Sequence, residues 1–498
     1  MKSDTITAIA TAMSDSGIGI VRVSGDEAIS IVDKIYQNVH HEKVLKQYKS
    51  HTIHYGFIVD EEGALVDEVM VSVMKAPRSY TTEDTVEINC HGGVLIVQKI
   101  LSLVMKAGAR IAEPGEFTKR AFLNGRIDLS KAEAVMDMIH AKNEFALQTS
   151  IKQLKGSLSD KIKILREEIL YEIAYIESAL DDPEHISLEG YYERLLDKSE
   201  HILKELNRLL DSADDGRMLK EGIHTVIVGK PNVGKSSLLN VLAGKERAIV
   251  TDVAGTTRDT LEETISLGNI TLNIIDTAGI RNTEDIVEKI GVEKARKISE
   301  EADLILYVID VSEPLDESDQ DIIKMIAGKN TIILLNKSDL KEIVNEQSVL
   351  DVMSSITSNH LSLVQEEKEQ SIGMCLDEKS DLTYQRIEGI EYSIYLIKTS
   401  TKEEYGIDLL TSLIKDMFFH GQLIYNDEVY ITNIRHKEAV YDAKKSMLEV
   451  HKSLDMNMPE DFYAIDLMSA YASLGLIIGE EVGDDLVNEI FSKFCMGK

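Results

Sequence analysis

The 498-residue sequence has little cysteine, little proline and no long apolar run. Its three cysteines, Cys90, Cys375 and Cys495, are widely separated and odd in number, which argues against a disulfide framework or a zinc site and favours a reducing compartment. No apolar run approaches the roughly 18 residues of a membrane span, and the first residues lack the apolar region of a signal peptide. We therefore expect a cytoplasmic protein without membrane contact.

Positive charge is also scarce, since 54 Lys and Arg stand against 86 Asp and Glu, giving a formal net charge of −32. A field of this sign repels nucleic acids and anionic membranes. Contact with RNA would therefore need a local basic patch or a partner. The sequence offers only a modest basic cluster at Lys119, Arg120, Arg126 and Lys131, so a partner-supplied basic surface is expected.

The six prolines leave long stretches that predict helix, most clearly residues 115–182. Residues 130–133 (Ser-Lys-Ala-Glu) fit a capping box, in which Ser130 and Glu133 satisfy two backbone N–H groups reciprocally. Apolar residues then recur at intervals of three and four, which predicts one stripe on a long helix packed in the core. The stripe consists of Leu154, Leu158, Ile162, Leu165, Ile169, Ile173, Ile176 and Leu180.

The length predicts about three domains. Short β-rich runs at 19–23 and 85–89 indicate an amino-terminal α/β domain, and alternating strands and helices from about 220 indicate a doubly wound sheet. Residues 341–392 are acidic and polar, and we interpret them as helical or partly disordered decoration. A helical face after residue 433 carries Ala439, Val440, Ala443, Met447 and Val450. We predict an α+β multidomain fold divided into 1–118, a helical part at 119–217, an inserted nucleotide domain at 218–420 and a second helical part at 421–498.

Residues 229–236 read Gly-Lys-Pro-Asn-Val-Gly-Lys-Ser and follow the apolar run 225–228. This is the pattern G-x-x-x-x-G-K-S of phosphate-binding loops, whose inward-turned backbone N–H groups cradle phosphates. Lys235 would reach the β- and γ-phosphates, and Ser236 would ligate Mg²⁺. The predicted contacts of this loop with the triphosphate are Asn232, Val233, Gly234, Lys235, Ser236 and Ser237.

Two further segments identify the base as guanine. Residues 336–339 (Asn-Lys-Ser-Asp) follow the apolar run 331–335, and the Asp339 carboxylate can accept from both N1–H and N2–H of guanine, a donor pair that adenine lacks. Residues 276–279 (Asp-Thr-Ala-Gly) place a carboxylate near Mg²⁺ and a glycine N–H that can sense the γ-phosphate. Three such segments, each at a strand's carboxyl end, predict GTP as the ligand.

The glutamine that orients the attacking water in many small GTPases is missing. Ile280 stands directly after Gly279, and an apolar side chain cannot orient water. No arginine finger is evident in the sequence either. The water-orienting group must therefore come from elsewhere in the chain.

Three other segments are more specific than the phosphate loop. The first joins 4–6 and 17–25 with 80–93, the second is 113–129 (Glu-Pro-Gly-Glu-Phe-Thr-Lys-Arg-Ala-Phe-Leu-Asn-Gly-Arg-Ile-Asp-Leu), and the third is 494–498 (Phe-Cys-Met-Gly-Lys). Through them nearly the whole chain resembles the tRNA-modification GTPases of the MnmE/TrmE family. The resemblance implies an amino-terminal folate-binding and dimerisation domain, a discontinuous helical domain and an inserted Ras-like P-loop G domain.

The resemblance also implies a reaction. With an FAD-dependent partner (MnmG, also called GidA), joined in a heterotetramer, the chain would add a carboxymethylaminomethyl group to C5 of the wobble uridine (U34) of tRNA. A 5-formyl- or methylene-tetrahydrofolate would supply the one-carbon unit, and Glu87 could accept from its pterin amino edge. Cys495 would be needed for modification, and the nearby Lys493 or Lys498 could favour its thiolate. The implied folate ligands are Arg22, Glu87, Arg126 and Lys498.

For GTP hydrolysis the resemblance implies a K⁺-activated homodimer in which two G domains meet across their nucleotides. The potassium ligands map to Asn232, Thr251, Val253 and Thr256, while Thr257 would close onto Mg²⁺. Glu288 would orient the attacking water, and Lys235 would assist at the phosphates. The implied GTP contacts beyond the phosphate loop are Thr251, Thr256, Thr257, Asp276, Gly279, Asn336, Lys337, Asp339 and Ser400.

Two other hypotheses stay open on the sequence. A regulatory or ribosome-assembly GTPase would share only the G domain and would perform no modification chemistry, which the folate-like and tail motifs disfavour. A non-enzymatic protein would use its helices as a scaffold and its G domain as a slow switch. Without the resemblance, Arg22, Glu87 and Glu288 would be interpreted as surface charges.

Overall fold

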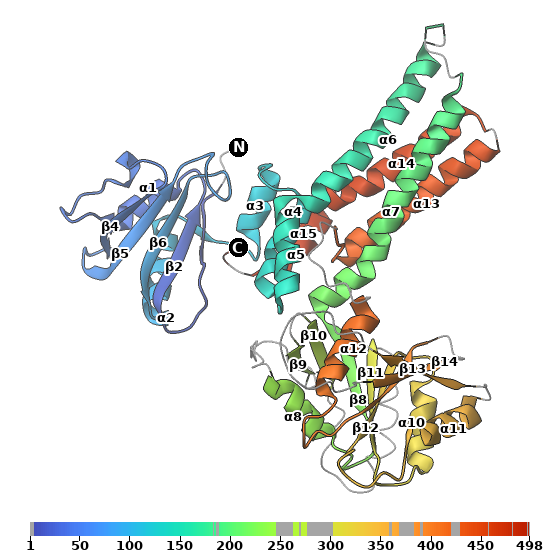
Figure 1. Cartoon of the computed structure of the whole chain (residues 1–498). Coiled ribbons are helices and arrows are strands. Elements are labelled where there is room, and N and C mark those ends of the chain that lie inside the picture. The colour runs from blue at the N-terminus through green and yellow to red at the C-terminus, as the bar shows by residue number, and fades with distance from the viewer. Residues whose placement is uncertain are drawn as a thin grey trace. The chain divides into compact units, whose positions relative to one another are not determined.

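The computed structural model describes residues 4–182, 184–185, 189–245, 262–267, 270–275, 302–357, 361–367, 383–388, 392–419, 429–456, 458–480, 482–495 and 497. The chain forms two compact units (Figure 1). The first comprises Met1–His140, Ser150–Arg208 and Arg435–Lys498, and the second comprises Ala141–Thr149 and Leu209–Ile434. The first unit is therefore built from segments that lie on both sides of the second in the sequence.

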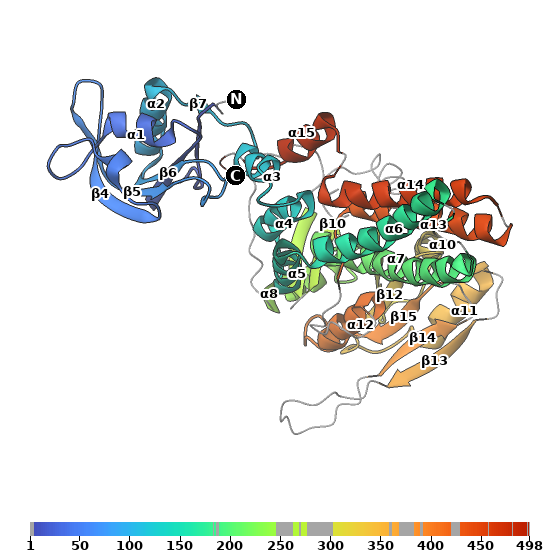
Figure 2. The same cartoon turned by 90° about the horizontal axis from the view of Figure 1, so that it is seen from above.

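A seven-stranded sheet forms the amino-terminal part of the first unit, in the order β3-β4-β5-β6-β2-β1-β7. Side chains alternate along β6, so that Val86, Ile88 and Cys90 are buried on the face that α1 and α2 cover (Figure 2), whereas Glu87 projects from the other face. The β-rich runs predicted at 19–23 and 85–89 are confirmed as parts of β2 and β6. The elements are β1 (Ile6–Ile9), β2 (Ser16–Ser24), α1 (Ala28–Ile35), β3 (Tyr36–Gln37), a 3₁₀ turn (Leu45–Gln47), β4 (Thr52–Val59), β5 (Leu65–Met74), β6 (Thr85–Gly92), α2 (Val94–Ala107) and β7 (Arg110–Ile111).

The stretch predicted as helix at 115–182 is broken into several helices. Gly156, with φ of 109°, separates α5 from α6, so Leu154 belongs to a different helix from the rest of the predicted stripe. Leu180 is exposed, whereas the stripe residues from 158 to 176 are buried, and α6 lies along α14 (Figure 1). The helices are α3 (Glu116–Leu123), α4 (Leu129–His140), α5 (Glu144–Lys155), α6 (Ser157–Asp181), α7 (Tyr191–Glu221), α13 (Ile434–Asp455), α14 (Glu460–Ile478) and α15 (Asp484–Ser492).

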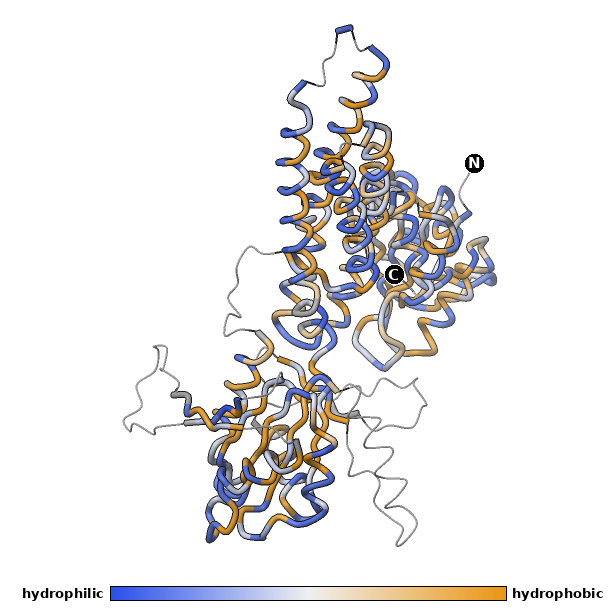
Figure 3. Tube along the Cα trace, turned by 90° about the vertical axis from the view of Figure 1, so that its right-hand side faces the viewer, coloured by the Kyte–Doolittle hydropathy of each residue, from blue (hydrophilic) through white to orange (hydrophobic). Residues whose placement is uncertain are grey.

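The helical face predicted after residue 433 is confirmed, since all five of its residues are buried on α13. Hydrophilic and hydrophobic residues alternate along the long helices (Figure 3). This pattern is typical of helices that bury one face and expose the other.

The predicted capping box at 130–133 is wrong. The helix begins at Leu129, two residues earlier than a Ser130 cap would require, and the cap is Asp128, whose carboxylate accepts from the Lys131 N–H at 3.0 Å and from the Ser130 hydroxyl at 2.6 Å. An Asp at this position caps the first turn through the Lys131 N–H, whereas the predicted box would have used the N–H groups of Glu133 and Ser130. Glu133 is thereby free of a capping role and lies buried in the helix.

Glu133 instead contacts two side chains from the start of α13, the Arg435 guanidinium and the His436 imidazole. The Arg435 guanidinium donates to its carboxylate at 2.8 and 3.1 Å, and His436 Nε2, which is fully buried, lies 2.7 Å from Oε2. Arg435 also donates to the carbonyl oxygens of Leu476 and Ile477 at the end of α14. Burial alone would raise the pKa of Glu133, but the charges of and hydrogen bonds from His436 and Arg435 outweigh it and lower the pKa to about 2.

The second unit contains an eight-stranded sheet in the order β13-β14-β15-β12-β11-β8-β10-β9. Its central strands are parallel, and β11 and β12 are buried along their whole length, as expected for strands covered on both faces. One face packs against α8 and α12, and the other packs against α10 and α11. The elements are β8 (Ile223–Val228), α8 (Lys235–Lys245), β9 (Glu262–Leu267), β10 (Ile270–Ile275), β11 (Leu304–Asp310), α10 (Glu317–Ile326), β12 (Thr331–Asn336), α11 (Glu346–Thr357), β13 (Ser362–Glu367), β14 (Thr383–Glu388), β15 (Ile394–Lys398) and α12 (Ile407–Phe419).

The decoration expected at 341–392 is only partly helical. After α11 the chain adds β13 and β14 as an antiparallel pair, and β14 continues the sheet beyond β15. Leu361 and Ile387 are buried in the core on that side, whereas most other side chains of the pair are polar. The polar, charged composition of residues 341–392 therefore gave no indication that two strands of this segment extend the sheet.

We expect Glu133→Gln to lower the free energy of unfolding of the first unit by about 3–5 kcal/mol at neutral pH, because it leaves the Arg435 guanidinium and the buried His436 without their carboxylate. Glu449→Gln on α13 is the control, since this half-exposed carboxylate pairs only with Lys452 among the described residues and should contribute less than about 1 kcal/mol. Chemical denaturation of both variants tests this.

The low pKa of Glu133 also predicts that the stability of the first unit depends on pH in the acid range. Because the folded-state pKa of Glu133 lies below its ordinary value of 4.5, its contribution is complete above pH 4.5 and is lost as the pH falls towards 2. The difference in stability between wild type and Glu133→Gln should therefore shrink across this window. A difference independent of pH between 4.5 and 2 would contradict the assignment.

Candidate functional site

The phosphate loop lies between β8 and α8, as predicted. Two of its glycines are required by close contacts as well as by positive φ angles of 147° and 107°. A Cβ on Gly229 would lie 2.4 Å from the Val308 carbonyl oxygen, and one on Gly234 would lie 2.3 Å from Asn336 Nδ2. The backbone of the loop can thus approach the neighbouring strand ends only without side chains at these positions.

Lys235 begins α8 directly after the phosphate loop, and Asn232 lies within the loop. The Lys235 ammonium donates to the carbonyl oxygens of Gly229 and Lys230, each at 2.6 Å, and so stays against the loop. Asn232 is exposed, with φ of 63°, a left-handed conformation that Asn tolerates better than most residues. Val233 is buried, while Ser236 and Ser237 are exposed in the first turn of α8.

Asn336 joins the phosphate loop to the predicted guanine loop. Its side-chain Nδ2 donates to the Val233 carbonyl at 2.8 Å, and its Oδ1 accepts from the Thr401 N–H at 3.1 Å. The residue is only 1% exposed, so both halves of the amide are used in a site that water reaches poorly. The structure therefore brings the phosphate loop, residues 336–339 and residues 400–401 together at one edge of the sheet.

The carboxylate that would recognise guanine is oriented by Ser400. The Ser400 hydroxyl donates to Asp339 Oδ1 at 2.7 Å, and this hydrogen bond holds the pKa of Asp339 below its ordinary value. Asp339 itself is exposed and presents its other carboxylate oxygen for binding. The acceptor is thus charged and directed before any ligand arrives.

Sequence reasoning missed Asp310, which ends β11 beside Asn336 in the sheet register. Its carboxylate is 3% exposed and lies 2.5 Å from Lys337 Nζ. Burial would raise the pKa of Asp310, but hydrogen bonds from Lys337 and Ser312 outweigh it and hold the pKa below the usual range. The sequence does show that Asp310 ends an apolar run and stands two residues before Ser312, and this pattern could have indicated a role for Asp310.

Lys230 in the phosphate loop is a second missed contact. Its ammonium lies 2.8 Å from the buried Asp319 carboxylate, which also accepts from the Tyr307 hydroxyl at 2.8 Å. A further ion pair with Asp316, the cap of α10, completes the anchor. The phosphate loop is thereby attached to α10 as well as to the strand that precedes it.

In the first unit, the predicted folate residues Arg22 and Glu87 face each other across β2 and β6. Arg22 Nε donates to Glu87 Oε1 at 2.8 Å, and Arg22 Nη1 donates to the carbonyl of Gly497 at 2.8 Å. Gly497 has φ of 86°, and a Cβ there would lie 2.3 Å from the Ile9 carbonyl oxygen. The carboxyl-terminal tail is therefore seated beside the predicted folate pair.

The tail leaves Cys495 exposed while its main chain is held. The Cys495 carbonyl accepts from the Gly115 N–H at 3.3 Å, and Phe494 packs with Phe491 in a small apolar core. The thiol is therefore accessible rather than buried as a small hydrophobic side chain. Arg126 lies elsewhere in this unit, over the ring of Tyr80.

Eight of the predicted site residues lie outside the described part of the chain. They are Thr251, Val253, Thr256, Thr257, Asp276, Gly279, Glu288 and Lys498. Among the described residues, no helix is long and apolar enough to cross a membrane, and no cluster of three metal-ligating side chains is present.

Comparison with known proteins places these features in one family. Residues 129–495 match the family profile of the MnmE helical domain, and residues 5–126 match that of the GTP-binding protein TrmE N-terminus. The chain belongs to the MnmE family of tRNA modification GTPases. This confirms the resemblance inferred from the sequence, together with the predicted α+β multidomain class.

The match to individual MnmE proteins extends over the full length. The tRNA modification GTPase MnmE of Lachnoclostridium phytofermentans is 53% identical over 100% of both chains. Those of Alkaliphilus oremlandii and Geobacillus thermodenitrificans are each 45% identical over 99% of both chains.

We expect Ser400→Ala to weaken binding of GDP and GTP by about two- to tenfold, because it removes the hydrogen bond that orients Asp339 together with a longer one from the Glu403 N–H. The control is Ser338→Ala in the same segment, because no side-chain hydrogen bond involves Ser338 among the described residues. Fluorescent-nucleotide titration measures both affinities. Equal losses in the two variants would show that Ser400 does not act through Asp339.

Proposed function

We propose that the chain is a GTPase that uses nucleotide turnover to support modification of the wobble uridine of tRNA. The observation that supports this proposal is that one chain contains two separate sets of site contacts. Asn336 holds a guanine-type loop against a phosphate loop, and Arg22 holds the carboxyl-terminal tail beside Glu87. A GTPase that acts only as a regulatory switch has no need of the second set of contacts.

In the nucleotide site, each predicted residue would have a defined task. Lys235 would neutralise negative charge on the β- and γ-phosphates, and the hydroxyl of Ser236 would ligate Mg²⁺ together with Thr257. Asp339 would accept from guanine while Asn336 and Lys337 frame it. Glu288 would orient the attacking water, because Ile280 cannot.

Asn232 would hold a potassium ion together with Thr251, Val253 and Thr256. Its side chain is exposed on the phosphate loop, and an amide oxygen suits a hard monovalent cation. When bound, K⁺ would supply the positive charge that an arginine finger supplies in other GTPases. Two G domains would meet face to face during this step, in a homodimer.

In the first unit, Arg22, Glu87, Arg126 and Lys498 would bind a 5-formyl- or methylene-tetrahydrofolate. The Glu87 carboxylate, oriented by its hydrogen bond from Arg22, is a good acceptor for a pterin amino edge, and the cationic side chains suit the folate carboxylates. Cys495 would stand exposed on the docked tail at the same place. Domain limits at residues 118, 217 and 420 would separate these activities.

The partners would be tRNA and an FAD-dependent subunit of the MnmG type, which together add a carboxymethylaminomethyl group at C5 of U34. The net charge of −32 opposes direct binding of tRNA, so the basic surface is expected on the partner. The deciding experiment is mass spectrometry of wobble uridines from cells that lack this chain. Loss of the modified uridine, restored by the wild-type gene, supports the proposal, and unchanged uridines would refute it.

We expect GTP hydrolysis to be faster in K⁺ than in Na⁺ at equal ionic strength, and we expect Asn232→Gly to abolish that difference. Glycine is chosen because it accepts the positive φ of this position while removing the amide oxygen. The variant should retain GDP affinity, which is measured in parallel. A variant still stimulated by K⁺ would remove Asn232 from the ion site.

A further inference from the structure

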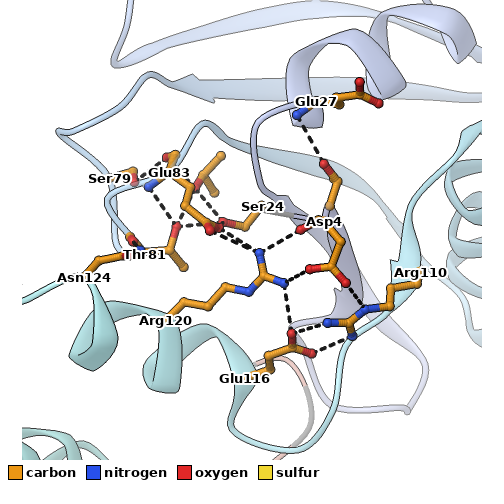
Figure 4. A network of polar contacts seen from close by, with 12 residues as sticks. Asp4, Ser24, Glu27, Ser79, Thr81, Glu83, Arg110, Glu116, Arg120 and Asn124 are labelled. Atoms are coloured by element: carbon orange, nitrogen blue, oxygen red, sulfur yellow. Dashed lines mark hydrogen bonds and ion pairs between the residues drawn. The ribbon is translucent and has the colours of Figure 1, made fainter. Parts of the chain in front are cut away.

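Helix α3 is joined to the strands of the first unit by a network of ion pairs (Figure 4). The Arg120 guanidinium lies at its centre and is 10% exposed. It donates to Asp4 Oδ1 at 2.7 Å, to Glu116 Oε1 at 2.9 Å and to both carboxylate oxygens of Glu83 at 3.1 and 3.2 Å. A buried guanidinium shared by three carboxylates fixes their relative positions more tightly than any single pair would.

The contact with Glu83 fastens a particular loop. Residues 79–84 lead directly into β6, the strand that carries Glu87. Within this loop Thr82 has φ of 64°, an unfavourable conformation for a β-branched residue that persists only where its surroundings enforce it. Glu83 also accepts from the Ser24 hydroxyl at 2.8 Å, which ties the loop to β2.

The segment from α3 to residue 126 makes three more contacts with the same loop. The Tyr80 hydroxyl lies 3.0 Å from Thr118 Oγ1, and Asn124 Nδ2 donates to the Thr81 carbonyl at 2.7 Å. Arg126 Nη1 donates to the Tyr80 carbonyl at 2.9 Å, with its guanidinium 4.8 Å from the centre of the Tyr80 ring. The position of Arg126 is therefore set by the loop.

Helix α3 also supports the other predicted folate arginine. The fully buried ring of Phe117 lies beneath Arg22, with the guanidinium carbon 5.6 Å from the ring centre. One helix thus contacts Arg22 directly and, through the loop, contacts Arg126 and the start of the Glu87 strand. These are three of the four residues that the proposed function assigns to folate.

We propose that Arg120 is a positioning residue of the folate site, holding residues 79–84 against α3 so that Arg126 and Glu87 keep a fixed separation. The inference rests on the proposed function for the identity of the ligand. A carrier bound at both its pterin and its carboxylate ends requires that separation, because binding groups that are not held in place must be ordered on binding, which lowers the affinity.

The chain offers a matched control in Arg110. Its guanidinium belongs to the same network and pairs with Asp4 and Glu116, but its remaining hydrogen bond goes to the Ile111 carbonyl rather than to the loop. Arg120→Met combined with Glu83→Gln, and Arg110→Met combined with Asp4→Asn, each remove one guanidinium and one carboxylate from the network. The two double variants therefore change the charge equally, but only the first removes the ion pair that joins residues 79–84 to α3.

The test measures the dissociation constant of 5-formyltetrahydrofolate for the full chain, together with amide hydrogen exchange of residues 79–87 without ligand. We expect Arg120→Met/Glu83→Gln to raise the dissociation constant about tenfold or more and to accelerate exchange in 79–85. Arg110→Met/Asp4→Asn should change the dissociation constant less than about twofold. GTP hydrolysis, which the proposed function assigns to the other unit, should stay the same in both, and a cooperative unfolding transition of the first unit in each variant shows that this unit is folded.

Three outcomes would overturn the inference, and they are distinguishable. A folded Arg120→Met/Glu83→Gln protein with wild-type affinity shows that the loop needs no such fastening. Equal weakening in both double variants shows that the network contributes stability alone. Absence of saturable folate binding by the wild type removes the proposed folate function itself, and the inference falls with it.

Discussion

The buried carboxylate of Glu133 is the constraint on which the first unit depends. A buried carboxylate must be paired and hydrogen-bonded, and the chain supplies its partners from Arg435 and His436, some 302 residues further on. Because Arg435 also reaches the carbonyls that end α14, the same group aligns α13 and α14 with α4. The helix α14 that is aligned in this way also packs along α6.

The nucleotide site depends on a different device, the neutral amide of Asn336. Its donor and acceptor ends connect loops from three parallel strands, whose carboxyl ends meet at one edge of the sheet. Buried carboxylates then hold the lysines of these loops in place. Asp310 forms an ion pair with Lys337, and Asp319 forms one with Lys230. The neutral amide of Asn336 thus fixes the relative positions of the loops, and the charged side chains lie where phosphate and guanine would bind.

Local motifs were predictable because their chemistry and spacing are contained in a few consecutive residues. The phosphate loop, residues 336–339 and the buried face of α13 are of this kind. The sequence misled where one residue had two possible roles, as with Glu133, which fits a capping box yet is needed in the core. Asp310, the tail beside Arg22 and the strands β13 and β14 could not be predicted because they depend on contacts between distant segments.

The interrupted order of the segments also affects synthesis. All residues of the second unit have left the ribosome before Arg435 does, whereas the first unit still lacks α13, α14 and the tail. At roughly 5–20 residues per second, translation of 209–434 takes on the order of 10–45 seconds. During that interval the apolar face of α6 is without α14, its main partner among the described helices. The nascent helical segment therefore exposes apolar surface to which a chaperone could bind. The second unit, in contrast, has all its strands and can fold first.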